Sequence, residues 1–466
     1  MSTSSKKPIN AISNLRSKTG FEGQYKPPRS IKDQLALYNT PGMSIAIIDD
    51  YKIEWASGFG IYETGIDKAV KTTTLFQAAS ISKPIFALAV MRLVEEGKLN
   101  LDEDVNNYLT SWQVPMNGKW QPRLTLRHLL SHTGGVTVHG FQGYQPSDPI
   151  PTISEILNGE ESSNSEKIEV NILPGLQFSY SGGGITIAQQ VIEDVLNKPF
   201  TTIMEELVLD PLGMKNSTFN RPSDNWKARC ATGHTLNGVP LSEKYNIHPE
   251  LAAAGLWTTA SDLAVAGVEL LQVLRGKSSS FLSVEMVESM LTPQLINQND
   301  NSEYYGLGFF CSGSKSGFRF SHGGWNEGFI ADFNICKNSG KGVVIMLNSN
   351  EGEPLLEEVV RSVSLEYDWP TLSPPKTRII DFEPTLDYTG EYKTDFDLTF
   401  LVAKKGNTFM LKLASQPDLI LYPISIYKFY AEATNTSVLF RVNKSQKIVS
   451  ISVSQAGQDF NAIKVH

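Results

Sequence analysis

Strand-like segments stand at both ends of a long helix-rich stretch, and this arrangement constrains the fold more than any other feature. Near the start, MSIAIIDD and YKIEWASGFG predict two strands joined by a turn at Asp49-Asp50. Much later, FRFSHGGWNEGFIADFNICKNSGKGVVIMLNSN returns to strand patterns, whereas intervening segments such as GITIAQQVIEDVL are helical. We therefore expect an α+β fold whose antiparallel sheet is completed by segments far apart in the chain.

The sequence pattern changes after DWPTLSPPKTR, where Pro370, Pro374 and Pro375 disfavour helix and favour an extended linker. Beyond it, segments such as LTFLVAKKGNTFMLKLA alternate apolar and polar residues with period two, which predicts an all-β barrel or sandwich. We expect four parts, which are a flexible N-terminal segment (1–28), a main domain (29–368), a proline-rich linker (369–380) and a β-barrel domain (381–466).

Composition excludes several classes of protein. The 466 residues are 41% hydrophobic, which is enough for at least one large core. A net charge of -8 provides no basic field, so we expect no nucleic-acid partner. The three cysteines, Cys230, Cys311 and Cys336, are far apart and lack metal-ligand spacing, so neither a disulfide framework nor a structural zinc is expected.

The compartment and the assembly stay undecided at this stage. No run of about 18 apolar residues exists, so no membrane span is expected. MSTSSKKPIN is followed by polar residues rather than by the apolar core of a signal peptide. If this start is native, the protein is cytoplasmic, but a chain whose signal had been removed would look the same. The sequence equally leaves open whether the chain forms a homo-oligomer.

The segment FQAASISKPIFALAVMRLVEEGKL predicts a buried helix with an unusual first turn. Pro84 has no N–H and is tolerated only in a first turn, which places the helix start close to Ser80. Ser80 and Lys83 then share a face at the positive end of the helix dipole. A lysine in this position can draw a proton from the serine hydroxyl and activate it as a nucleophile.

The bare Ser-x-x-Lys pattern is weak evidence, and on the pattern alone Ser80 is a plain N-cap. One repeat of the pattern lies in an alternating strand segment, where residues three apart point to opposite faces. The further occurrences are Ser4/Lys7, Ser312/Lys315, Ser373/Lys376 and, in that strand segment, Ser425/Lys428.

Two other segments hold candidate site residues. Tyr180 lies in a glycine-rich loop immediately before a helix, where a phenol can reach a cleft, although tyrosines are more often packing residues. His322 ends an apolar strand, with Gly323 and Gly324 behind it allowing close approach of a ligand to the backbone. A turn histidine is the alternative interpretation.

Together, SISK, SYSGGG and SHGGW resemble the serine hydrolases of the penicillin-binding protein and class C β-lactamase superfamily. That family has Ser-x-x-Lys, then Tyr-x-Asn, then Lys-Thr-Gly or His-x-Gly. PGMSIAIIDD, LRHLLSHTGGV, LDPLGMKNSTF and AAAGLWTTASDLA look like further family segments, so the resemblance covers roughly residues 30 to 365. It implies a β-lactamase/transpeptidase-like antiparallel sheet with a helical subdomain. LDYTGEYKTD and LYPISIYKFYA resemble the lipocalin-like barrel appended to many such hydrolases.

The resemblance also implies roles for individual residues. Ser80 Oγ would be the nucleophile of an acyl-enzyme, while Lys83 and Tyr180 would share the work of general base and acid. The backbone N–H groups of Ser80 and Trp325 would form the oxyanion hole. His322 stands where penicillin-binding enzymes often have lysine. The family chemistry needs no metal and no organic cofactor.

Two departures from the family pattern concern substrate binding. Gly182 replaces the asparagine of Tyr-x-Asn, and Gly323 replaces the threonine, so both positions lose a side-chain hydrogen bond to an amide-containing substrate. Gly182, Gly323 and Gly324 are the expected substrate-binding positions. The glycine at 182 is also expected to enlarge the cleft beside Ser80.

The expected function is a serine hydrolase acting on a small ester or peptide-like amide, as an esterase or a peptidase for D-amino-acid substrates. Transfer of the acyl group to an amine or alcohol, as by an acyltransferase or peptide cyclase, is the second interpretation. A catalytically inactive binding protein that works through its barrel is the third.

Overall fold

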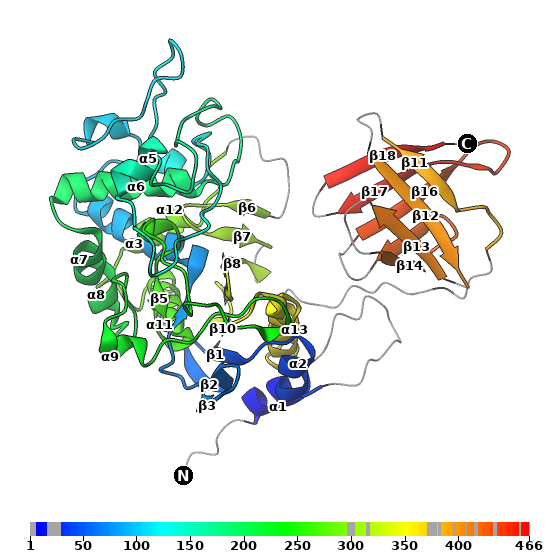
Figure 1. Ribbon diagram of the computed structural model, residues 1–466, viewed down its shortest axis with the longest axis horizontal. Helices are drawn as coiled ribbons and strands as arrows, with labels where there is room; N and C mark the ends of the chain where they lie inside the picture. Colours follow the sequence, from blue (N-terminus) through cyan, green and yellow to red (C-terminus); the bar gives the residue numbers. More distant parts are fainter. Residues whose placement is uncertain are drawn as a thin grey trace. The chain divides into compact units, whose positions relative to one another are not determined.

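The computed structural model describes residues 6–15, 29–295, 303–313, 317–370, 380, 384–394, 398–406, 408–413, 418–431, 436–455 and 458–465. These residues form two compact units (Figure 1). The first contains the described residues up to 370 and the second those from 380 onward.

The described part of the first unit is built on an eight-stranded antiparallel sheet whose strands come from both ends of its sequence. β1 pairs with β10, so that Met43 lies opposite Leu347, which confirms that distant segments complete the sheet. The first turn consists of Asp50 and Tyr51, both in the left-handed region, one residue later than predicted. In order across the sheet, the strands are β3 (Ile66–Ala69), β2 (Lys52–Glu63), β1 (Gly42–Asp49), β10 (Lys341–Leu347), β9 (Phe329–Cys336), β8 (Arg319–Asn326), β7 (Phe310–Ser312) and β6 (Glu303–Tyr305).

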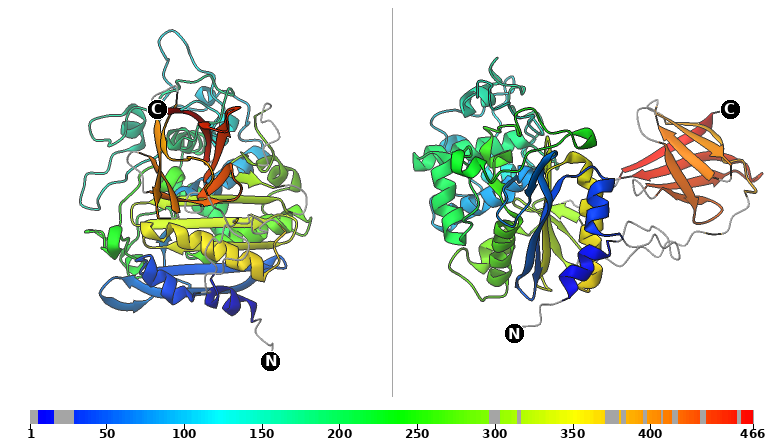
Figure 2. Two further views of the ribbon diagram at one scale, coloured as in Figure 1. Left: turned by 90° about the vertical axis from the view of Figure 1, so that its right-hand side faces the viewer. Right: turned by 60° about the horizontal axis from the view of Figure 1, so that its bottom comes forward.

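Helices cover both faces of this sheet because the central strands are apolar on both sides. Ile45 and Ile47 pack into the core with α13 (Glu353–Glu366), whereas Ala46 and Ile48 belong to the core of the larger helical layer. Figure 2 shows α13, α1 (Lys7–Ser13) and α2 (Ile31–Leu37) on one side and the other helices opposite. Those helices are α3 (Ser82–Glu95), α4 (Leu126–Leu130), α5 (Ile153–Asn158), α6 (Gly182–Leu196), α7 (Phe200–Met204), α8 (Asp210–Leu212), α9 (Asp224–Lys227), α10 (Leu251–Ala254), α11 (Ala260–Leu274) and α12 (Val284–Met290). A small separate sheet pairs β4 (Phe76–Gln77) with β5 (Trp257–Thr258).

Part of the segment that we expected to be flexible is an ordered helix. α1 packs against α13, and its Ala11 and Ile12 are buried. Asn10 Nδ2 also donates a hydrogen bond to Glu366 Oε1 at 3.2 Å. Burial of these apolar side chains stabilises the docked helix. Residues 16–28 and most of the expected linker lie outside the described residues.

The second unit is a closed antiparallel barrel, in which β11 pairs with both β12 and β18. This confirms the predicted all-β module. Its interior is filled by aromatic rings, since the Phe429 centroid lies 5.1 Å from Tyr388, 5.6 Å from Phe409 and 5.2 Å from Phe440. These edge-to-face contacts build a side-chain core in the part of the barrel that the structure describes. The strands are β11 (Gly390–Lys393), β12 (Thr399–Lys405), β13 (Thr408–Leu413), β14 (Leu419–Pro423), β15 (Lys428–Ala431), β16 (Thr436–Val442), β17 (Ile448–Gln455) and β18 (Gln458–Val465).

We predicted that Ser425 and Lys428 lie in one strand, and this prediction is wrong. Ser425 is in the turn between β14 and β15, and its Oγ accepts hydrogen bonds from the N–H groups of Tyr427 at 3.2 Å and Lys428 at 2.9 Å. A serine hydroxyl used in this way stabilises a turn. The other repeats each include a residue outside the described part of the chain, namely residues 4, 315, 373 and 376.

The aromatic core predicts where the barrel is sensitive to substitution. Phe429→Ala should lower the free energy of unfolding of the barrel by about 3–5 kcal/mol, because it removes a fully buried ring at the centre of the cluster. Hydrogen exchange in the full chain should show faster exchange in β11–β18 and unchanged exchange in β1 and β10. The control is Ile420→Ala on an exposed barrel position. Equal effects of the two substitutions would contradict the assignment of the core.

Candidate active site

Ser80 lies in a short 3₁₀ turn, η1 (Ala79–Ile81), and α3 begins two residues later at Ser82. The helix therefore starts slightly later than the sequence predicted. A 3₁₀ turn has three residues per turn, so side chains at i and i+3 lie directly above one another. Lys83 Nζ accordingly donates a hydrogen bond of 2.9 Å to Ser80 Oγ.

Lys83 is buried in the first turn of α3 and has a second partner. Its Nζ donates to the carbonyl oxygen of Ala253, in α10, at 2.8 Å. α10 is itself held by α6, because the N–H of Ala252 donates to Gln189 Oε1 at 2.9 Å. The lysine head is therefore fixed between the serine hydroxyl and a buried carbonyl, with little freedom to leave the serine.

β8 lies close against the turn that carries Ser80. A Cβ atom at Gly324 would be 2.1 Å from the carbonyl oxygen of Ala78, so glycine is required for this approach. Ala79 has a φ of 48°, a left-handed conformation that costs a residue other than glycine about 1–2 kcal/mol. This strained residue immediately precedes the serine. β7 begins at Phe310, which pairs with Ser321, so the part of β8 after Ser321 is not paired with β7 and contacts η1 instead.

Tyr180 is brought to the same place by the start of α6. It precedes Ser181, the N-cap, whose Oγ accepts a 2.9 Å hydrogen bond from the N–H of Gly184. Lys83 Nζ lies 5.1 Å from the centroid of the Tyr180 ring. The structure therefore brings Ser80, Lys83 and Tyr180 together from two helix N-termini.

His132 and Tyr305 also belong to this cluster, and our sequence reasoning assigned neither of them a role. His132 Nδ1 accepts a 3.1 Å hydrogen bond from the N–H of Ser181, and its ring centroid is 4.2 Å from that of Tyr180. Tyr305 lies 4.7 Å from His132 between ring centroids. The segment LRHLLSHTGGV contained the signal for His132, a polar residue within a family-like stretch, whereas Tyr305 had none.

His322 is a neutral group in the structure. Its Nδ1 is 2.6 Å from the carbonyl oxygen of Gly323, which can only accept, so this nitrogen carries the proton. Its Nε2, at 3.1 Å, then accepts from the hydroxyl of Tyr305. Burial, aided by the positive charge of Lys83, lowers the pKa of His322 to about 3. Burial also raises the pKa of Tyr305 well above its usual value and, with Lys83, lowers that of His132.

The three glycines expected to bind substrate have different surroundings. A Cβ atom at Gly182 would be 2.9 Å from the ring of Phe141. The expected enlargement of the cleft is therefore wrong, because the Phe141 ring occupies that space. Gly324 packs against Ala78, whereas the nearest atom to a Cβ at Gly323 is 3.9 Å away, which leaves that position open. Trp325 follows in β8 with 61% of its surface exposed.

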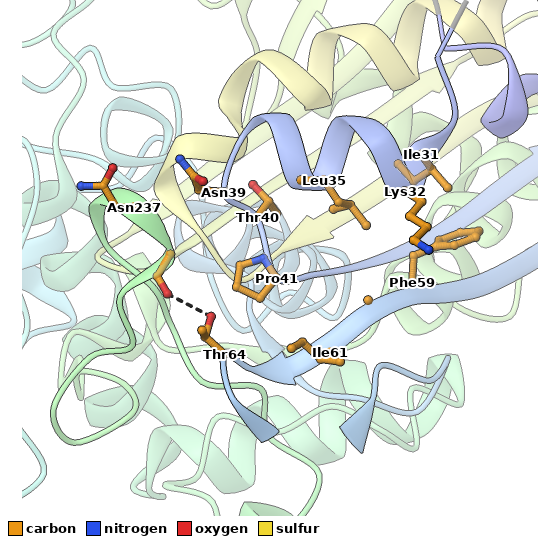
Figure 3. Close-up of a pocket in the computed structure, with 13 residues that line it drawn as sticks. Ile31, Lys32, Leu35, Asn39, Thr40, Pro41, Phe59, Ile61, Thr64 and Asn237 are labelled. Atoms are coloured by element: carbon orange, nitrogen blue, oxygen red, sulfur yellow. Dashed lines mark hydrogen bonds between the residues drawn. The ribbon is translucent and has the colours of Figure 1, made fainter. Parts of the chain in front are cut away.

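A pocket of about 610 Å³ lies elsewhere in the first unit, between α2 and β2 (Figure 3). Thr64 Oγ1 donates a 2.9 Å hydrogen bond to the carbonyl oxygen of Gly238 at its side. Lys32 is the one ionisable side chain among the residues that line it, and none of the candidate site residues does so.

The described residues contain neither a metal-binding cluster nor a membrane-spanning helix. No group of three or more His, Cys, Asp and Glu side chains is arranged there to hold a metal ion. Among the same residues, no helix combines the length and apolar character needed to span a bilayer.

Comparison with known proteins identifies the family to which this fold belongs. Residues 29–364 match the Beta-lactamase family, so the chain belongs to that family. Protein flp of Staphylococcus aureus (strain N315) is 25% identical over 342 residues, which cover 71% of this chain and 64% of protein flp. This chain thus matches less than two thirds of that relative's length.

Two further similarities extend over more of the chain. Penicillin-binding protein 4* of Bacillus subtilis (strain 168) is 24% identical over 410 residues, covering 83% of this chain and 87% of that protein. The octameric penicillin-binding protein homologue from Pyrococcus abyssi superposes with a TM-score of 0.64 at 23% identity. That match covers 93% of this chain and 98% of the homologue, and it shows that the fold is shared.

The low pKa of His322 leads to a pH prediction. A histidine with a pKa of about 3 in the folded protein carries no charge above about pH 4, because burial and Lys83 disfavour the imidazolium form. His322→Gln should therefore leave the acidic limb of a kcat/KM profile unmoved between pH 5 and 8, even if the absolute rate falls. The measurement is the pH dependence of ester hydrolysis. Loss or displacement of an acidic limb near pH 6 would show that the histidine titrates in this range.

Proposed function

We propose that this protein is a serine hydrolase that forms an acyl-enzyme on Ser80. The 2.9 Å hydrogen bond between Lys83 Nζ and Ser80 Oγ, in a buried site beside Tyr180, is the observation that supports this most strongly. Membership of the beta-lactamase family agrees with the same chemistry. Neither the substrate nor the individual roles below follow from family membership alone, so they are part of the proposal.

In the acylation step, the deprotonated amine of Lys83 accepts the hydroxyl proton of Ser80 as Oγ attacks the substrate carbonyl. The N–H groups of Ser80 and Trp325 donate to the oxygen that becomes negative. Tyr180 delivers a proton to the departing alcohol or amine as its bond to the carbonyl carbon breaks. A proton then passes from Lys83 to Tyr180, which restores both groups.

In the second step, water attacks the acyl-enzyme and gives up a proton to the same pair of groups, and Ser80 leaves as the free hydroxyl. The acid product carries the acyl group. We propose small esters and peptide-like amides as substrates, including amides of D-amino acids. The relatives named as penicillin-binding proteins favour the peptide-like branch, and the octameric homologue favours assembly into a homo-oligomer.

Two other functions use features of the same chain. An acyltransferase or peptide cyclase would pass the acyl group to an amine or alcohol in place of water, and adding such a nucleophile to the assay distinguishes the products. A catalytically inactive binding protein is less consistent with the structure, because aromatic rings fill the interior of the barrel.

Substitution of the cluster tests the mechanism. Ser80→Ala should abolish acylation, and Lys83→Ala should nearly do so, since nucleophile and base act as one unit. Tyr180→Phe should lower kcat/KM by about 10²-fold, the scale of a positioned acid or base. The readouts are hydrolysis of nitrophenyl esters and D- and L-aminoacyl anilides, and mass spectrometry after a serine-reactive phosphonate. Ser425→Ala is the matched control and should leave both unchanged. Near-native turnover by Lys83→Ala would contradict the mechanism.

The environment of residue 182 predicts a preference between substrates. Gly182 offers no side-chain amide, and a missing hydrogen bond of this kind is worth about 0.5–1.5 kcal/mol. His322 is neutral and gives no positive charge to the carboxylate of a β-lactam. We therefore expect kcat/KM for nitrocefin to be about 2- to 10-fold or more below that for a short-chain nitrophenyl ester.

The corresponding control is the double variant Gly182→Asn/Phe141→Ala, which restores an amide and makes room for it. It should narrow the difference between nitrocefin and the ester. If the unmodified protein hydrolyses both substrates with equal efficiency, a nearby group already replaces the missing amide and the preference is wrong.

A further inference from the structure

An aromatic surface extends from Tyr180 away from the nucleophile. The Tyr180 and Phe310 rings are nearly parallel, with an interplanar angle of 9° and centroids 6.4 Å apart. Phe178 lies 6.5 Å from Phe310 and 5.7 Å from Tyr305. We call Phe178, Tyr180 and Phe310 the aromatic rim, and Tyr305, with the two neutral histidines, its floor.

The rim is unusual because it is exposed although it is strongly apolar. Phe178 is 39% exposed and Phe310 is 40% exposed, while the floor is buried. Leu173 and Leu176, in the loop that leads to Phe178, are more exposed still. Large apolar side chains that gather at one place on a surface generally mark a binding site.

The floor adds no charge to this surface. The pKa of His322 is lowered to about 3 and that of Tyr305 is raised well above its usual value, so both are neutral at pH 7. The floor beneath Phe178 and Phe310 therefore offers a carboxylate no opposite charge in return for its lost water. An uncharged, flat or branched apolar group would instead release water from rings that are already ordered.

The position of Tyr180 indicates which part of a substrate meets the rim. In the proposed function, on which this inference rests, Tyr180 protonates the departing alcohol or amine. Its ring lies next to Lys83 and stacks on Phe310, so the departing group is drawn toward Phe310 and Phe178. We propose that Phe178 and Phe310 form a subsite that selects substrates with an aromatic or bulky apolar leaving group.

A pair of esters with the same acyl group tests the subsite. Benzyl acetate and 2-methoxyethyl acetate release alcohols of similar acidity, so their ratio of kcat/KM reports binding of the leaving group. The unmodified protein should favour the benzyl ester. Phe178→Ala and Phe310→Ala should each lower that ratio by about 5- to 10-fold, mainly through KM, because stacking acts in both ground and transition states.

Several controls make the test specific. Phe310→Leu keeps an apolar side chain and should retain part of the preference. Leu236→Ala removes an apolar side chain that is even more exposed, at 70%, and far along the chain from the rim, and it should change nothing. Nitrophenyl acetate and nitrophenyl phenylacetate differ only in the acyl group, and their ratio should be unaffected by the rim variants.

The outcomes separate this inference from the proposed function. If both acetate esters are hydrolysed and the ratio is unchanged in Phe178→Ala/Phe310→Ala, the subsite is overturned while the hydrolase stands. If the acyl-group ratio changes instead, the rim binds the other side of the substrate and the assignment is wrong. If no ester turns over and the phosphonate does not label Ser80, the proposed function falls, and the subsite with it.

Discussion

The contact between β8 and the turn that carries Ser80 is the constraint on which the rest of the site depends. The missing side chain of Gly324 lets the strand reach the carbonyl of Ala78, and the left-handed Ala79 directs the chain into the 3₁₀ turn. This 3₁₀ turn then places Ser80 directly above Lys83. A side chain at 324 would separate the sheet from the helical layer at a position where both contribute to the site.

Around this contact, the two histidines of the site carry no charge at neutral pH. Burial, with a smaller contribution from the nearby charge of Lys83, keeps His132 and His322 neutral. In each neutral histidine, one ring nitrogen is therefore a hydrogen-bond donor and the other an acceptor. His132 accepts from the N–H of Ser181, and the Nδ1 proton of His322 faces a carbonyl. The loop that holds Tyr180 is therefore positioned by groups whose charge does not change near neutral pH.

Local rules account for the features that the sequence predicted well. The missing N–H of Pro84 restricts it to a first turn, and this located the start of α3 to within two residues. Period-two alternation identified the barrel strands, whose closure needs only pairing between the first and last of them. The α+β sheet followed from strands at both ends of a helical segment.

The features that the sequence did not reveal depend on contacts between distant segments. Phe141 fills the space at Gly182 from a loop forty residues earlier, and no periodicity reports such a contact. Tyr305 meets His322 only because β6, β7 and β8 are adjacent. Ser425 was misplaced for a different reason, because a short turn that contains Tyr427 continues the alternation of the strands around it.

The pairing of β1 with β10 also has a consequence for biosynthesis. β1 contains Met43 and emerges early from the ribosome, but its partner across the sheet, which includes Leu347, emerges only when most of the chain has been made. Until then, one edge of the β1–β2 hairpin lacks its neighbour, and such unpaired edges are prone to misassociate. A prematurely terminated chain would contain the nucleophile yet lack the strand that completes its surroundings.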